Sequence, residues 1–141
     1  MKRITKTLFI FVALTALLLS LTACGNGIKA DRAKADTSSF FDAIKAGNYE
    51  LAATYLHPDR PVDLKTFFEG IESKLNVDFS DVKIVRYTGV SVSVYDSDVG
   101  GSCCELDADL SVSGVLFEAE IEFVKNDAGY GIYNFGIDKE D

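Results

Sequence analysis

The sequence contains a single histidine, His57, among its 141 residues. One histidine cannot build a metal site by itself, because zinc sites in proteins combine several ligands. Catalysis of the Ser-His-Asp or Cys-His type would need this histidine beside a nucleophile, and the sequence has no recognisable nucleophile motif. We therefore expect no metal, no cofactor and no catalytic residue.

Basic residues are also scarce, since 14 Lys and Arg stand against 22 Asp and Glu. Three of the 14, Lys2, Arg3 and Lys6, lie at the N-terminus, so the chain beyond residue 23 keeps 11 basic residues and a side-chain charge of −11. Nucleic acids and anionic lipid headgroups are negative and repel such a domain. Nucleic acid is thereby excluded as a partner.

The longest apolar run, residues 8–21, is too short for a membrane span, because a helix needs about 20 apolar residues to cross a bilayer. The basic residues before it give the order of a secretory signal. The run ends in Leu21-Thr22-Ala23-Cys24, which resembles the bacterial lipobox, where a lipoprotein signal peptidase cuts before the Cys and the thiol carries a diacylglycerol. The alternative is an ordinary signal peptide with a chance cysteine at the cut.

This resemblance implies a division of the chain. Residues 1–23 are a lipoprotein signal peptide, residues 24–29 are the lipidated Cys24 and a short tether, and residues 30–141 form a single domain. Two or more acyl chains anchor a protein stably. We expect a protein held by lipid at the outer face of the bacterial cytoplasmic membrane or in the outer membrane.

Apolar residues at three- and four-residue spacing predict three helices in the first half of the domain. The first covers residues 29–46 and should end at Gly47. The second runs from about Tyr49 to Leu56 and ends before Pro58, since proline does not continue a helix. Asp63 can cap the third, whose apolar residues are Leu64, Phe67, Phe68, Ile71 and Leu75.

Beyond Asp81 the apolar spacing changes to two. Residues 104–112 and 115–123 alternate strictly, which predicts two half-buried antiparallel strands joined by a two-residue turn at Ser113-Gly114. Further strands are predicted at 82–88, 90–95 and 129–137. Three N-terminal helices followed by about five antiparallel strands indicate an α+β domain with the helices packed on one face of a curved sheet.

The segment FFDAIKAGNYELAATYL, residues 40–56, followed by a third helix and long hairpins, resembles the nuclear transport factor two-like (cystatin-like) superfamily. That superfamily includes ketosteroid isomerases and many small bacterial lipoproteins. The resemblance covers residues 30–137 and rests on the order of the elements and on this helix pair. It implies a cone-like sheet around the helices with a pocket at the open end, in which the enzymes place a base, usually Asp or His, and a proton donor.

The inward positions of the two clearest strands offer no such pair, because all are apolar except the Cys104 thiol. Residual candidates are Tyr49, Tyr55, Tyr87, Tyr95, Tyr130, Tyr133 and Asn134, for which a place in the core is the simpler explanation. His57 has two interpretations: it bonds the last carbonyls of the second helix, or it is a general base at the pocket mouth with Asp59. His57, Tyr55 and Tyr133 are the candidate ligand-binding residues.

Cys103 and Cys104 are the only cysteines left to pair with each other if Cys24 carries lipid. Neighbours in a strand point to opposite faces, so we expect Cys104 to be buried and Cys103 to be exposed. A strained redox disulfide between them is the alternative.

The loop DSDVGGS, residues 96–102, has some features of a calcium loop, with Asp96, Asp98, Gly101 and Asp107 at suitable spacing. Its fifth position is Gly100 instead of a ligand. An Asp- and Gly-rich hairpin turn is the simpler explanation.

Six carboxylates lie on the outer side of the two clearest strands. Counting back from the turn gives the opposed pairs Asp109 and Glu118, Asp107 and Glu120, and Glu105 and Glu122. Like charges directly opposite one another are destabilising. We call these six residues the acidic face; it suits a cation or a basic partner, or it is simply a solvated surface whose repulsion costs little.

Two functions follow as expectations. The first is a surface-tethered lipoprotein that acts as a non-catalytic binding or interaction module, whose cone holds a small apolar ligand or whose acidic face meets a basic protein or envelope component. The alternative is a small pocket enzyme of isomerase or hydrolase type that uses His57, Asp59 or a pocket tyrosine.

Overall fold

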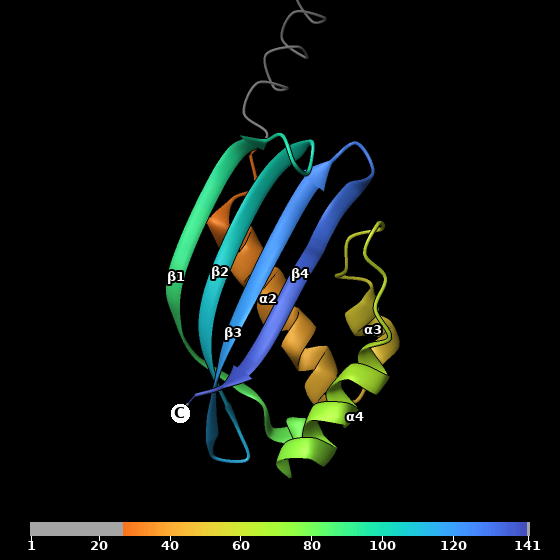
Figure 1. Ribbon diagram of the computed structural model, residues 1–141, viewed down its shortest axis with the longest axis vertical. Helices are drawn as coiled ribbons and strands as arrows, with labels where there is room; N and C mark the ends of the chain where they lie inside the picture. Colours follow the sequence, from red (N-terminus) through yellow and green to blue (C-terminus); the bar gives the residue numbers. More distant parts are fainter. Residues whose placement is uncertain (1–26, 141) are drawn as a thin grey trace, which may run out of the picture.

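One open sheet of four antiparallel strands, with helices on one of its faces, forms the domain (Figure 1). This computed structural model describes residues 27–140, and Cys24 lies outside the described residues. The predicted α+β class, with the helices first in the chain, is confirmed. Within residues 27–140, every helix is too short or too polar to cross a membrane.

The first helix, α2 (Ala30–Lys45), ends where the sequence predicts. Gly47 adopts a φ of +66°, a conformation that glycine reaches without steric cost. The N–H of Gly47 donates to the carbonyl of Ile44, and the N–H of Asn48 donates to the carbonyl of Ala43, both at 2.9 Å. These two bonds form a Schellman motif and satisfy carbonyls that the helix end would leave free.

The second helix, α3 (Tyr49–Ala53), is shorter than the predicted segment, which extends to Leu56. The backbone beyond it pairs with the sheet instead. Ile132 donates its N–H to the carbonyl of Tyr55 and accepts from the N–H of His57, each at 2.8 Å. This parallel bridge beside Ile132 competes with the helix for the same backbone groups and ends it early.

The third helix, α4 (Leu64–Leu75), begins as predicted, because the side chain of Asp63 accepts the backbone N–H of Thr66 at 3.1 Å. Its apolar side faces the core, although Leu75 at the last turn remains 37% exposed. A short 3₁₀ helix, η1 (Phe79–Asp81), leads into the sheet.

The strands are β1 (Lys83–Asp96), β2 (Gly101–Val112), β3 (Val115–Asn126) and β4 (Gly129–Lys139). We predict separate strands at 82–88 and 90–95, but β1 covers both. Gly89, which lies between them, pairs with Asp107 and keeps the ladder continuous. The described sheet therefore has four strands instead of about five, with the backbone at Leu56 bridging the outer edge of β4.

The turn between β2 and β3 fixes the register of the central hairpin. Ser113 and Gly114 both have positive φ, 52° and 76°, as a type I′ turn requires. Val112 then pairs with Val115, as predicted. Because side chains alternate between faces, this single pair decides which residues of both strands are buried.

The inner face of the sheet and the helices enclose an aromatic core. On β2 and β3 the inward residues are buried, apart from the partly buried Val115 at the turn: Cys104, Leu106, Ala108, Leu110, Val112, Phe117, Ala119, Ile121 and Phe123. Rings from both layers meet them, and Phe68 contacts Phe40, Phe67, Phe79 and Phe135 with ring centroids 4.8 to 6.3 Å apart. The family resemblance implies a pocket between the sheet and the helices. In this structure aromatic rings fill that space.

Candidate functional site

The acidic face has the predicted geometry. Asp109 pairs with Glu118, Asp107 with Glu120 and Glu105 with Glu122 across β2 and β3. All six side chains point away from the helices, because their neighbours in sequence fill the inner face. Three opposed pairs of carboxylates therefore follow one another along the outside of the central hairpin.

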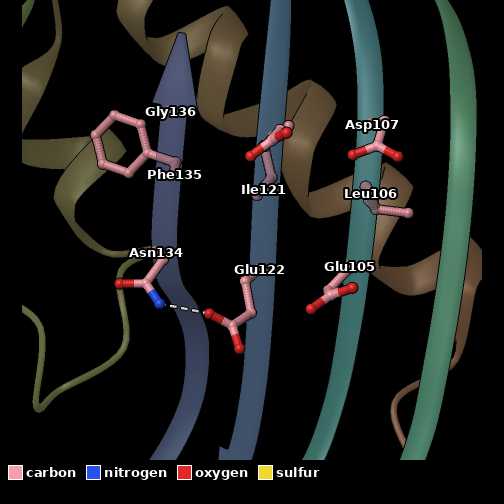
Figure 2. A pocket seen from close by; sticks show the side chains of 9 residues that line it. Glu105, Leu106, Asp107, Ile121, Glu122, Asn134, Phe135 and Gly136 are labelled. Carbon is pink, nitrogen blue, oxygen red and sulfur yellow. Dashed lines mark hydrogen bonds between the residues drawn. The ribbon is translucent and has the colours of Figure 1, made fainter.

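An open cleft of about 480 Å³ lies over two of these pairs. Glu105, Asp107, Glu120 and Glu122 line it, and Asn134 of β4 closes one side (Figure 2). Its floor includes the backbone at Leu106 and Ile121, with Phe135 and Gly136 beside it.

Two glycines flank the middle of the acidic face. The pair of Asp107 and Glu120 has Gly89 on the β1 side and Gly136 on the β4 side. A Cβ at Gly89 would lie 2.2 Å from Oδ2 of Asp107, so the carboxylate rests over the bare backbone there. A Cβ at Gly136 would meet nothing within 4 Å. The direct neighbours of this pair on β1 and β4 therefore add no side chain to the outer face.

Neighbouring strands neutralise only part of the acidic face. Nε of Arg86 on β1 lies 2.6 Å from Oδ2 of Asp109, and Asn134 donates to Glu122. Asn134 carries no charge, so within residues 27–140 only Asp109 of the six forms an ion pair, and the five without one are Glu105, Asp107, Glu118, Glu120 and Glu122. A seventh carboxylate, Asp138, pairs with Glu118 from β4 and extends the row. The face is an array of negative charge with one resident guanidinium at its end.

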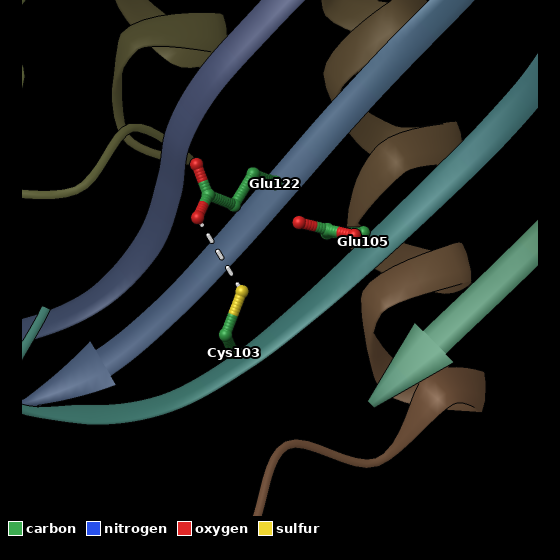
Figure 3. A group of neighbouring side chains, drawn as sticks. All are labelled: Cys103, Glu105 and Glu122. Carbon is green, nitrogen blue, oxygen red and sulfur yellow. Dashed lines mark hydrogen bonds between the residues drawn. The ribbon is translucent and has the colours of Figure 1, made fainter. Parts of the chain in front are cut away.

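Cys103 is buried at 6% exposure, so the prediction that it is exposed is wrong. It lies on the outer side of β2, opposite the fully buried Val124 of β3. Its thiol donates to Oε1 of Glu122 at 3.4 Å (Figure 3). Burial, this hydrogen bond and the nearby carboxylates raise the pKa of the Cys103 thiol to about 12.

Cys103, Glu105 and Glu122 place their donor atoms within 4.8 Å of one another (Figure 3). A thiolate and two carboxylates could hold a divalent cation. The raised pKa keeps the sulfur protonated near neutral pH, however, and a thiol that donates to Glu122 is not a ready ligand. This cluster is therefore a hydrogen-bonded end of the acidic face.

Cys103 and Cys104 are both free thiols, which excludes the strained disulfide in this structure. They point to opposite faces of β2, Cys104 into the core. Burial is the largest cause that raises the pKa of each thiol. At pH 7 to 8 we expect iodoacetamide to leave both unmodified in the native protein and to modify both in urea, as followed by peptide mass. Rapid native labelling of Cys103 would contradict this burial.

The calcium-loop alternative is not supported by the geometry. Oδ1 of Asp96 accepts the backbone N–H of Asp98 at 2.8 Å, which is a local turn contact. Asp107, the twelfth position, lies six residues along β2 from Gly101, about 20 Å at the rise of a strand. It belongs to the acidic face instead.

His57 neither caps a helix nor stands free as a base. It is 1% exposed and lies four residues beyond the end of α3. The backbone N–H of Asp59 donates to Nδ1 at 3.1 Å, so Nδ1 carries no proton and Nε2–H donates to Oδ1 of Asn126, also at 3.1 Å. Both ring nitrogens are thus used to fix the loop after α3 to the β3–β4 turn. A general base needs a free nitrogen that a substrate can reach, so this arrangement does not favour the enzyme alternative.

The tyrosine candidates have structural contacts. Tyr133 lies between His57, with ring centroids 5.2 Å apart, and the guanidinium of Arg60, 4.3 Å from its ring. Tyr55 is partly buried against the core. The Tyr130 hydroxyl donates to Asp36 at 2.7 Å. The structure therefore brings His57 and Tyr133 together without opening a pocket between them, since their rings are in edge-to-face contact.

Five residues that flank the acidic face from β1 and β4 were not identified from the sequence: Arg86, Gly89, Phe135, Gly136 and Asp138. Alternation identifies outward carboxylates within one hairpin, but the partners that flank them come from β1 and β4. Only the pairing of those strands shows that a guanidinium closes one end and that glycines flank the middle.

Comparison with protein-family models, with curated proteins and with solved structures finds no match to this chain.

Proposed function

We propose that this protein is a lipid-anchored, non-catalytic module that binds a cationic partner through its acidic face. One observation carries the proposal: four carboxylates in two opposed pairs, from β2 and β3, line the cleft. No Lys or Arg of residues 27–140 forms an ion pair with any of the four. Opposed like charges cost free energy in the free protein, and a cationic group that enters the cleft removes that cost.

The spacing of the carboxylates suggests the form of the partner. Successive pairs are two residues apart along the strands, which is about 6.6 Å. An extended peptide presents every second side chain on one side at the same interval. A basic segment with Lys or Arg at alternate positions would therefore match two or three pairs, in the way that Arg86 already meets Asp109 at 2.6 Å.

The anchoring part of the proposal rests on the sequence, since residues 1–23 and Cys24 lie outside the described residues. Ile28, which we place in the tether, is buried in the core, so the tether ends before Ile28. At the reach of an extended chain, Cys24 lies no more than about 14 Å from Ile28. A lipid on Cys24 would hold the domain close to the outer membrane surface, where basic envelope components or basic segments of membrane proteins are the available partners.

Membership of the nuclear transport factor two-like superfamily is part of the same proposal. The order of three helices followed by long antiparallel hairpins supports it. The pocketed cone of that superfamily is not needed for binding on the outer side of the sheet.

The binding proposal is tested with a synthetic peptide of alternating Lys and Ser and the Glu120→Lys variant. Glu120→Lys places a cation opposite Asp107, so the chain should fold while affinity for the peptide falls by about ten-fold or more. Glu50→Lys on α3 is the matched control, because it changes the net charge equally in the helical layer and should change affinity by no more than about two-fold. Affinity is measured by fluorescence anisotropy. An equal loss of affinity in both variants would show that only the net charge matters and would contradict the proposal.

A further inference from the structure

The two edges of the sheet differ in their protection. The outer edge of β4 is bridged at Ile132 by the backbone of Leu56. The outer edge of β1 pairs with no segment of residues 27–140, and in Figure 1 it forms the open side of the molecule. An open edge presents unpaired N–H and C=O groups that can pair with another strand.

The exposed stretch of β1 lacks the usual protection by charge. Residues 87–95 contain no charged side chain in a chain of net charge −8. Val90, Val92 and Val94 are 46%, 47% and 76% exposed, and Tyr95 is 69% exposed. Proteins usually place lysine, proline or a bulge within such an edge. Here the register shifts flank the stretch, between Tyr87 and Gly89 and after Ser93, and leave residues 89–93 regular.

The sequence of this stretch is a palindrome. Residues 90–94 read Val-Ser-Val-Ser-Val, so it has the same order in both directions. In an antiparallel pair of two identical strands centred on Val92, Val90 faces Val94 of the second copy, Ser91 faces Ser93, and Val92 faces its own counterpart. All apolar contacts then fall on the helix side of the sheet, and serines meet on the outer side.

We propose that the β1 edge is an interface between two copies of this chain, which pair antiparallel about a twofold axis at Val92. A twofold interface needs a surface that is complementary to itself, and the palindrome supplies this at every position from 90 to 94. The absence of charge means that no like charges face each other within the contact. The two sheets join into one of eight strands, and the two acidic faces lie side by side on the same surface. This inference does not depend on what the acidic face binds.

The test is the sedimentation of the full-length chain in detergent, with and without Val92→Lys. The wild-type chain should form a dimer, and Val92→Lys should raise the dissociation constant by at least about ten-fold, because it sets two lysines opposite each other. Val85→Lys is the matched control and should leave the dimer intact, because Val85 also lies on β1 and is 56% exposed against 47% for Val92, but it is outside the palindrome. Added salt should strengthen the wild-type dimer, since both copies are negative.

A wild-type chain that is monomeric at all concentrations, or a dimer that Val92→Lys does not weaken, would overturn the proposal. A monomer would indicate that the β1 edge is available to pair with a strand of another protein.

A second variant keeps the test decisive if a lysine at position 92 impairs folding. Either class of antiparallel pair puts opposed Cα atoms about 4.5 to 5.5 Å apart, within the range of a disulfide. Val92→Cys should therefore give a covalent dimer under a mild oxidant, and Val85→Cys should not, because the antiparallel register separates the two copies of residue 85 by many residues. Equal cross-linking of both variants would contradict the twofold axis at Val92.

Discussion

Phe68→Ala is expected to lower the free energy of unfolding by about 3 to 5 kcal/mol, the usual cost of removing a fully buried phenylalanine ring. Phe68 has no exposed surface, and four rings surround it, of which Phe79 is nearest at 4.8 Å between centroids. These rings come from α2, α4, η1 and β4, so one truncation loosens both layers of the domain. Because a domain of this size is stable by only about 5 to 15 kcal/mol, much of its stability would be lost.

The measurement is urea unfolding followed by far-ultraviolet circular dichroism, since the chain has no tryptophan to report on the core. Leu51→Ala on α3 is the control, because Leu51 is 47% exposed and lies away from the β1 edge, so its loss should change stability by no more than about 0.5 kcal/mol. A cost below about 1 kcal/mol for Phe68→Ala would mean that the inner face is a loose pocket instead of a close-packed core.

Cys24→Ser is expected to abolish lipid attachment completely, if the proposed lipobox is correct. The wild-type chain extracted from membranes should lack residues 1–23 and carry the mass of a lipid on Cys24. The serine variant should carry no lipid, and it should lose incorporation of a labelled fatty acid. Each buried CH₂ of an acyl chain contributes about 0.8 kcal/mol, so two chains hold the wild-type protein in the membrane fraction until detergent is added.

Cys103→Ser is the control for this experiment, because Cys103 is buried in the sheet and should accept no lipid. Intact mass reports both the cleavage and the modification. A wild-type chain that keeps residues 1–23, or fatty-acid label that survives in Cys24→Ser, would refute the anchor and leave the acidic face unaffected.

The central hairpin could be predicted in detail from the sequence because a two-residue turn allows a single register. Once Ser113 and Gly114 form the turn, strict alternation places every carboxylate of the acidic face, and the observed pairs agree. The caps at Gly47 and Asp63 were predictable for a similar reason, since each depends on contacts within a few residues.

The features that sequence reasoning missed all depend on contacts between distant segments. The register of β1 shifts at three places, so alternation does not show that Arg86 reaches Asp109. The end of α3 is set by backbone pairing between Leu56 and Ile132, which lies 76 residues further along the chain. The spacing of apolar residues within the helix contains no information about so distant a partner. Cys103 follows the outward pattern and is nevertheless buried beside Val124.

The affinity of the alternating Lys and Ser peptide as a function of ionic strength tests the central claim most directly. If the acidic face binds cations, the dissociation constant should rise on the order of ten-fold between about 50 mM and about 500 mM NaCl, because salt screens exposed charges. A peptide of the same composition with its lysines in one block should bind more weakly at low salt. An affinity that does not change with salt would contradict binding through the acidic face.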